Sequence, residues 1–341
     1  MSLHTTVNPV LATDMIMLAL TAGLVPYMTG SPGIGKSSIY KDIAKNNNLF
    51  LIDMRLSQCD PIDLAGLLTL QNGKAKYVPL DSLPIETDTI PDGYAGWLLV
   101  LDEFSSANQA VQAASYKLVL DKMVGTLKLH PRVLIVCAGN LESDNAIVQP
   151  LSTALQSRFV HIKLGVSSKD WIDWAVDNGI HHTIISFLRF RPVNFYTFTP
   201  DHEDSTYACP RTWEFASKLL KKAELSNPVL RPLLEGTVSV PVAAEFLSYC
   251  KIYEQCPTVP QIIADPTKVI IPDSPSILFA VIGTIANNVT KENFKALMEY
   301  IVRLPLEFQV VCLKDINKRS PLMMQTPEVR SWLRINATEL F

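Results

Sequence analysis

The chain has 341 residues, of which 48% are hydrophobic and 18% are charged, and its formal net charge is −3. This composition excludes an intrinsically disordered chain and supplies enough apolar side chains for about two domains with buried cores. The charge balance shows no basic excess and so gives no sign of a nucleic-acid partner, although a local basic stripe stays open.

The cysteines and the N-terminal residues suggest a compartment. None of the six cysteines forms a C-x-x-C pair, so we expect reduced thiols. The first ten residues lack a basic region followed by an apolar stretch, so we expect no secretion signal. The apolar run 15–28 is interrupted by Gly23 and Pro26 and is too short to span a bilayer. We therefore expect a cytoplasmic protein with no membrane partner.

Short apolar runs alternate with helical patterns up to about residue 164. Continuous apolar strands separated by helices are typical of a parallel sheet that is covered on both faces. The sequence therefore predicts an α/β fold with a five-stranded parallel sheet. Pro26 lacks a ladder donor, so we expect it at a strand start or at an unpaired position. The predicted strands are residues 24–28, 49–52, 97–101, 133–138 and 159–162.

Beyond residue 164 the pattern becomes helical. Trp171 and Trp174 lie three residues apart, which places both on one face of a helix. Five prolines interrupt residues 257–275, which we predict to be a connector. The predicted helices are residues 168–178, 212–224, 242–256, 277–288 and 291–302, with a helical tail at 310–341.

Residues 29–38 have the sequence TGSPGIGKSS, which fits the phosphate-loop pattern G-x-x-x-x-G-K-[ST]. Glycines let backbone N–H groups turn toward phosphate oxygens, and the following helix N-terminus adds partial positive charge. Lys36 would contact the β- and γ-phosphates, and Ser37 would hold Mg²⁺. A chance glycine-rich turn is the alternative, which the strand before and the helix after disfavour. The predicted nucleotide-binding residues here are Gly30, Ser31, Pro32, Gly33, Ile34, Gly35, Lys36, Ser37 and Ser38.

An apolar strand ends in Asp102 and Glu103. A carboxylate beside a phosphate loop can orient Mg²⁺ through its water shell, and the next acid can polarise the attacking water. We predict these roles for Asp102 and Glu103, respectively. A solvated acidic turn is the alternative, which the position two strands after Lys36 disfavours.

Three further polar residues occupy suggestive positions. Asn140 follows the strand 133–138 and could position water or contact the γ-phosphate, although an asparagine that caps a turn is equally compatible. Arg158 precedes the fifth strand, and Arg211 opens a helix in the second region. Isolated arginines are usually solvated or paired with surface acids, so the residues alone leave the roles of these two open.

The chain resembles the AAA+ ATPases, and within them the MoxR-like branch that is found in bacteria and their phages. The order and spacing of the motifs are those of Walker A, Walker B, sensor 1, arginine finger and sensor 2. The matching stretches are GSPGIGKSS, RLSQCDPIDLAG, LLVLDEFSSAN, VCAGN, ALQSRF and CPRTWEFA.

This resemblance implies a role for each matching residue. Asn140 would be sensor 1, Arg158 would be an arginine finger that completes a neighbour's site, and Arg211 would be the sensor-2 arginine. The implied cofactors are ATP and Mg²⁺, and the implied assembly is a closed homo-oligomeric ring, as a hexamer. Relatives often carry Asp before the finger arginine, whereas this chain has Ser157, which puts the orientation of Arg158 in doubt.

The resemblance also implies a domain organisation. A P-loop NTPase core would occupy residues 1–165, an all-helical lid with sensor 2 residues 166–257, and a helical C-terminal extension residues 258–341. Residues 66–93 resemble the helix-2 insertion of the branch, in which residues 68–77 predict a hairpin around Asn72-Gly73. An ordinary surface hairpin is the alternative. Any second hairpin, within residues 123–132, would be short.

The resulting functional hypothesis is an ATP-hydrolysing remodelling motor, or chaperone, that acts on a protein client in a bacterial or infected host cell. The resemblance suggests a separate partner with a von Willebrand factor A-like (VWA) domain. One alternative is a nucleic-acid-directed motor or loader, which the net charge and the scarcity of lysine clusters disfavour. Another is a nucleotide-gated scaffold that hydrolyses slowly, which would not need Lys36, Asp102, Glu103 and Arg158 together.

Overall fold

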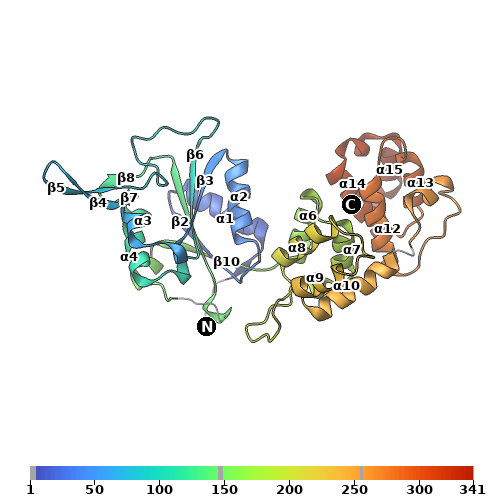
Figure 1. The fold of residues 1–341 in the computed structure, drawn as a ribbon. Helices are drawn as coiled ribbons and strands as arrows, with labels where there is room; N and C mark the ends of the chain where they lie inside the picture. Colours follow the sequence, from blue (N-terminus) through green and yellow to red (C-terminus); the bar gives the residue numbers. More distant parts are fainter. Residues whose placement is uncertain (1–4, 145–148, 254–255, 341) are drawn as a thin grey trace. The chain divides into compact units, whose positions relative to one another are not determined.

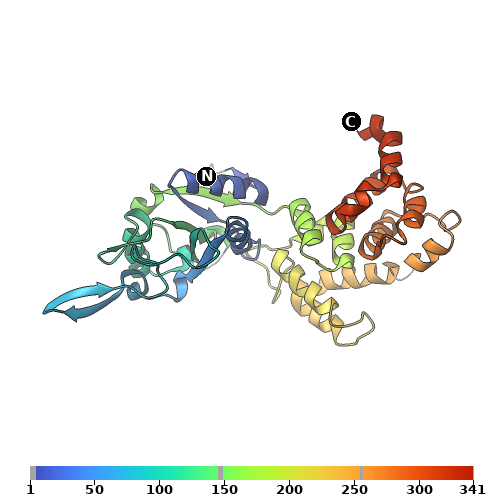
Figure 2. The ribbon, with the colours of Figure 1, turned by 90° about the horizontal axis from the view of Figure 1, so that it is seen from above.

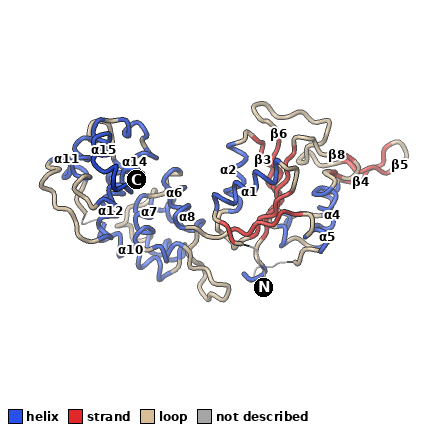
Figure 3. The backbone as a smooth tube through the Cα atoms, turned by 180° about the vertical axis from the view of Figure 1, so that it is seen from behind, coloured by secondary structure: helices blue, strands red, loops and turns tan. Residues whose placement is uncertain are grey.

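The computed structural model describes residues 5–144, 149–253 and 256–340. The chain forms two compact units. The first comprises Met1–Ser167 with Thr199–His202, and the second comprises Ser168–Phe198 with Glu203–Phe341. In Figure 3 the strands belong to the first unit, whereas the described secondary structure of the second unit is helical.

The first unit is built on a parallel sheet with strand order β1-β10-β2-β9-β6-β3. The predicted sheet of five strands is wrong by one, because β1 adds a sixth at the edge beside β10. β1 has two residues, too few for an apolar pattern to mark a strand. The strands are β1 (Thr6–Val7), β2 (Val25–Thr29), β3 (Leu49–Arg55), β6 (Gly96–Asp102), β9 (Val133–Gly139) and β10 (Phe159–Leu164).

Pro26 lies at a position of β2 where its missing N–H donor does not interrupt the hydrogen bonds to β9. It is the second residue of β2, and the pairing of β2 with β9 begins only at Tyr27. The expectation of a strand start or an unpaired position is thus confirmed for the β9 side.

Helices cover both faces of the sheet. Figure 1 shows α1 and α2 on one side and α3 and α4 on the other. On the α4 side, Leu99 and Leu101 of β6 join Val111 and Leu118 of α4 in one buried cluster. The helices are α1 (Pro9–Thr21), α2 (Lys36–Asn46), α3 (Pro61–Ala65), α4 (Gln109–Leu120) and α5 (Thr153–Gln156).

The predicted hairpin is present as β4 (Leu67–Gln71) and β5 (Lys74–Val78), joined by Asn72 and Gly73 with φ of 52° and 74°. Positive φ at both turn residues is the type I′ geometry that favours Asn-Gly. Figure 2 shows this hairpin extending outward from the rest of the first unit. A second hairpin, β7 (Met123–Val124) with β8 (Leu127–Lys128), is as short as expected.

The second hairpin supports the base of the first. Gly125 in its turn has φ of 58°, and a Cβ there would lie 2.6 Å from Cβ of Tyr77 and 2.7 Å from the Ala65 carbonyl oxygen. This close approach requires glycine at position 125.

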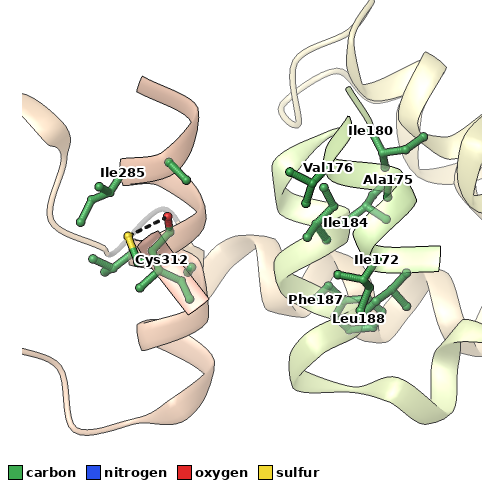
Figure 4. Packing of buried hydrophobic residues seen from close by; sticks show 14 of the residues in the cluster. Ile172, Ala175, Val176, Ile180, Ile184, Phe187, Leu188, Ile285 and Cys312 are labelled. Atoms are coloured by element: carbon green, nitrogen blue, oxygen red, sulfur yellow. Dashed lines mark hydrogen bonds between the residues drawn. The ribbon is translucent and has the colours of Figure 1, made fainter. Parts of the chain in front are cut away.

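Helices of the second unit pack around one buried cluster. Figure 4 shows part of it, in which side chains of α6 and α7 pack together while Cys312 and Ile285 lie on other helices. The helices are α6 (Ser168–Asp177), α7 (His182–Phe190), α8 (Pro210–Leu220), α9 (Leu230–Val238), α10 (Val240–Tyr253), α11 (Val259–Ala264), α12 (Pro275–Asn288), α13 (Phe294–Ile301), α14 (Leu306–Arg319) and α15 (Pro327–Leu340).

Two features of this unit qualify the sequence predictions. The expected connector 257–275 contains the short helix α11, because Thr258 and Gln261 form a capping box and Pro260 falls in the first turn, where proline is tolerated. The cluster contains residues from both sides of residue 258, and the division into lid and extension at that residue stays a prediction.

No helix among the described residues has the length and apolar character needed to cross a membrane.

Candidate nucleotide site

Three strands of the first unit end close together at one edge of the sheet. β9 lies between β2 and β6, so the residues that follow these strands are neighbours. The Gly30 N–H, just after β2, donates to the Gly139 carbonyl at the end of β9, at 3.3 Å. After β2 the chain passes to β3 at the far edge and later returns on the other side as β10. Ligands of parallel α/β sheets bind outside the carboxyl ends of strands at such a switch in order.

Backbone constraints shape the loop between β2 and α2. A Cβ at Gly30 would lie 2.6 Å from Cδ1 of Ile34 and 3.0 Å from the Leu164 carbonyl oxygen. Gly35 has φ of 102° and occupies the N-cap of α2, where among the described residues no side chain bonds the cap. Glycine at these positions lets the loop close tightly and leaves the helix N–H groups for an anion.

Lys36 is buried at the first position of α2, with an exposed fraction of 8%. Its ammonium donates to the carbonyls of Gly30 at 2.5 Å and Ser31 at 3.0 Å, and to Oδ1 of Asn140 at 3.0 Å. Since an ammonium only donates, Asn140 must present its oxygen to Lys36 and direct its NH₂ group elsewhere. The cation therefore stands between the loop and the end of β9.

Ser37 links the loop to the acidic pair. Its hydroxyl donates to Oδ2 of Asp102 at 2.8 Å, and Oδ1 of Asp102 accepts the Glu103 N–H at 2.7 Å. Hydroxyl and carboxylate oxygens are the hard donors that Mg²⁺ prefers, and Mg²⁺ typically takes one or two protein ligands together with phosphate oxygens. Ser37 and Asp102 thus fit Mg²⁺. Within the described ranges, no cluster of three His, Cys, Asp or Glu residues could bind a metal ion by itself.

Glu103 sits in a strained turn. Its φ and ψ are 55° and 31°, the left-handed region that non-glycine residues rarely adopt. The turn is closed by a hydrogen bond from the Ser106 N–H to the Glu103 carbonyl at 2.9 Å. The Ser57 hydroxyl, just beyond β3, donates to Oε2 of Glu103. Backbone strain at a carboxylate held by a neighbouring hydroxyl is typical of a functional residue.

Asn140 is held through its backbone as well. Its N–H donates to Oγ of Ser105 at 2.9 Å, and Ser105 is 3% exposed. Sequence reasoning missed both Ser57 and Ser105, because a serine beyond a strand has no distinctive local pattern. The matching stretches RLSQCDPIDLAG and LLVLDEFSSAN contain these two serines without marking them.

Charges on β3 also face this region. Desolvation raises the pKa of Asp53, and the nearby Asp102 carboxylate raises that pKa further, whereas Arg55 and Lys41 lower it. Asp53 was not predicted from the sequence.

The remaining predicted residues occupy the same loop and α2 or follow later in the chain. Pro32 and Gly33 form the middle of the loop, and Ser38 is exposed in the first turn of α2. Arg158 is exposed between α5 and β10, where its guanidinium donates to the Ala154 carbonyl at 2.6 Å. Arg211 is exposed in the first turn of α8, in the second unit. The roles of both arginines stay predictions.

No protein-family model and no curated protein sequence matches this chain. Among solved structures, the chain is similar to the Thermotoga maritima RuvB Holliday junction branch migration motor, at 15% identity and a TM-score of 0.36, over 72% of this chain and 74% of that chain. NtrX from Brucella abortus matches at 14% identity and a TM-score of 0.40, over 92% of this chain and 69% of that chain. Likeness at this level supports no conclusion about this chain.

The left-handed backbone at Glu103 can be tested through stability. Glu103→Gly should be more stable than Glu103→Ala by about 1 kcal/mol, because glycine adopts positive φ without a Cβ penalty. Guanidinium unfolding followed by circular dichroism measures the difference. At Glu142, which has no positive φ, the same pair should show the opposite order. Equal stability of the two Glu103 variants would contradict the strain.

Proposed function

We propose that this chain is an ATP-hydrolysing AAA+ motor of the MoxR-like type that works as a ring on a protein client. The observation that carries the proposal is the convergence of Lys36, Ser37, Asp102, Glu103 and Asn140 through direct hydrogen bonds at one sheet edge. These residues come from α2, from the end of β6 and from the residue after β9. Together they supply a phosphate-binding cation, ligands for Mg²⁺, a base and an amide.

Each side chain has a task that its position suits. The buried Lys36 ammonium would exchange part of its contact with the loop carbonyls for phosphate oxygens. Glu103 would accept the proton of the attacking water, since its carboxylate follows the Mg²⁺ ligand Asp102 directly. The Asn140 NH₂ group, turned away from Lys36, would donate to that water or to the γ-phosphate. When bound, Mg²⁺ would neutralise charge that develops on the phosphates.

Replacing the base tests the hydrolysis proposal. Glu103→Gln keeps the size of the side chain and removes the proton acceptor, so steady-state phosphate release from ATP should fall about 10²-fold or more. ATP binding, measured by equilibrium titration, should stay within about threefold of the unaltered protein, because the phosphate loop and Lys36 are untouched. Equal rates of phosphate release in the two proteins would overturn the assignment.

The ring proposal depends on Arg158. Its guanidinium is exposed and, within the described residues, donates to the Ala154 carbonyl of its own turn, so it is accessible to a neighbouring copy. An arginine that completes the next subunit's site requires a head-to-tail interface, and such an interface forms a ring when its rotation closes. The hexameric number comes from the resemblance to the AAA+ ATPases.

Mixing two inactive variants tests this arrangement. Arg158→Ala should lower phosphate release by about 10³-fold, because an arginine finger stabilises charge in the transition state. When Arg158→Ala and Glu103→Gln subunits are mixed equally, about a quarter of the interfaces pair an intact base with an intact arginine. Activity should therefore recover in the mixture. No recovery, while each variant still assembles by light scattering, would show that Arg158 does not act across an interface.

The β4–β5 hairpin is the proposed contact with the client. The register pairs Leu68 with Tyr77 and Leu70 with Ala75, which places these apolar side chains on one face. Leu70 is 82% exposed and Leu68 is 58% exposed. An exposed apolar face of this kind is typical of a protein interaction surface. The resemblance to MoxR-like proteins suggests a VWA-domain protein as the partner.

Substitutions on the two faces of the hairpin test the client proposal. Glu103→Gln protein with ATP should retain the client in affinity capture, and the added changes Leu68→Ser and Leu70→Ser should reduce recovery of the captured VWA-domain protein at least tenfold, because they remove the apolar contact. Thr69→Ser with Lys76→Gln, on the opposite face, is the matched control. Equal capture with either pair of changes would exclude the apolar face.

A further inference from the structure

Ser105 lies at the centre of the hydrogen bonds behind the candidate site. It is in the short 3₁₀ helix η2 (Phe104–Ser106), two residues after Glu103. Its Oγ accepts the Asn140 N–H at 2.9 Å and lies 3.4 Å from the Asn140 carbonyl, to which it can donate. Asn140 follows the last residue of β9, so its amide is outside the strand and Ser105 supplies the acceptor. Leaving a buried N–H group without an acceptor costs free energy, so this hydrogen bond restricts the position of the Asn140 backbone.

Packing confines the Ser105 hydroxyl. The Tyr27 hydroxyl of β2 lies near the Ser105 side chain, which lowers the pKa of Tyr27 against the larger, raising effect of burial. A Cβ at Gly139 would clash with the Tyr27 hydroxyl and would lie 2.8 Å from Oγ of Ser105. Both hydroxyls therefore lie directly against the backbone that leads to Asn140, and glycine at position 139 makes room for them.

The backbone of η2 is anchored from two other directions. The Ser105 carbonyl accepts the Gln149 N–H at 2.6 Å, and Gln149 begins the described segment that leads through α5 to Arg158. Nε2 of Gln112, a buried residue of α4, donates to the Phe104 carbonyl of η2 at 3.5 Å and to the Ala107 carbonyl just after η2 at 3.2 Å. The turn that carries Glu103 is thus tied to α4, to the end of β9 and to the segment before Arg158.

We propose that Ser105 is a positioning residue that sets the orientation of Asn140 relative to Glu103 for ATP hydrolysis. This inference rests on the proposed function. Ser105 itself lies behind the site, and it acts by holding the Asn140 backbone to the same turn that aims the Glu103 carboxylate. A shift of the Asn140 backbone would carry its side-chain NH₂ group away from the water or the γ-phosphate. Misplacement of a positioning group by about 1 Å can lower the rate about 10²-fold.

A double-mutant cycle on hydrolysis tests the inference. Ser105→Ala and Asn140→Ala should each lower kcat about tenfold or more, and the double variant should be no slower than Asn140→Ala alone, since Ser105 acts through Asn140. The KM for ATP of Ser105→Ala should stay within about twofold, because the phosphate loop is unchanged. Ser105→Thr, which keeps the hydroxyl, should recover part of kcat.

Ser115→Ala is the matched control. Ser115 is fully buried in α4 of the same unit, and its hydroxyl donates to the Gln112 carbonyl at 2.6 Å. Removing it deletes a buried hydroxyl without touching Asn140, so kcat should stay within about twofold of the unaltered protein. If Ser105→Ala fails to fold by circular dichroism, Tyr27→Phe removes only the hydroxyl behind Ser105 and should lower kcat in the same cycle with Asn140→Ala.

The outcomes separate this inference from the function on which it rests. Additive losses in the cycle, or equal losses from Ser105→Ala and Ser115→Ala, overturn the positioning role while hydrolysis by the unaltered protein still stands. Phosphate release by the unaltered protein no faster than by Glu103→Gln overturns both the proposed function and the role of Ser105.

Discussion

The hydrogen bond from Ser37 to Asp102 is the contact on which the geometry of the candidate site depends. It joins the start of α2 to the end of β6, although β9 separates β6 from the strand that leads into α2. Adjacent strands lie about 4.8 Å apart, so the contact spans two strand spacings. Only a loop that projects over the sheet edge can bridge this gap, and the crowding at Gly30 keeps that loop close. Asn140, which directly follows the middle strand β9, then lies within reach of Lys36.

Hydroxyl groups organise the site around this bridge. Ser57, just beyond β3, contacts the Glu103 carboxylate, and Ser105 holds the Asn140 backbone N–H from the turn after Glu103. Serine suits these positions because its hydroxyl can donate and accept within a small volume. Ser57 thereby orients the Glu103 carboxylate through a neutral hydroxyl. More distant cations, Arg55 and Lys41, moderate the negative charge at Asp53.

The two units differ in how they are stabilised. In the first, a sheet buried on both faces fixes the strand ends that carry the site. In the second, helices surround one apolar cluster, and a bidentate ion pair between Arg189 and Asp315 joins α7 to α14 at 2.5 and 2.7 Å, with both side chains largely buried. A buried pair of this kind is specific in geometry rather than strongly stabilising. The hydrogen-bonded residues Lys36, Ser37, Asp102, Glu103 and Asn140 all belong to the first unit.

Contiguous patterns were sufficient for part of this protein. The phosphate loop and the Asn72-Gly73 turn depend on neighbouring residues, whose φ preferences and spacing determine the local conformation. Each of the five longer strands contains a short run of mostly apolar residues. The two-residue β1 and the helix α11 inside a proline-rich segment carried too little pattern to predict.

Contacts across the sheet could not be predicted from local sequence patterns. Ser57 reaches Glu103 over 46 residues and Ser105 reaches Asn140 over 35, and an isolated serine has the same local signature whether it is solvated or bonded. Strand order, which places β6 between β9 and β3, decided those contacts, because it determines which strand ends become neighbours.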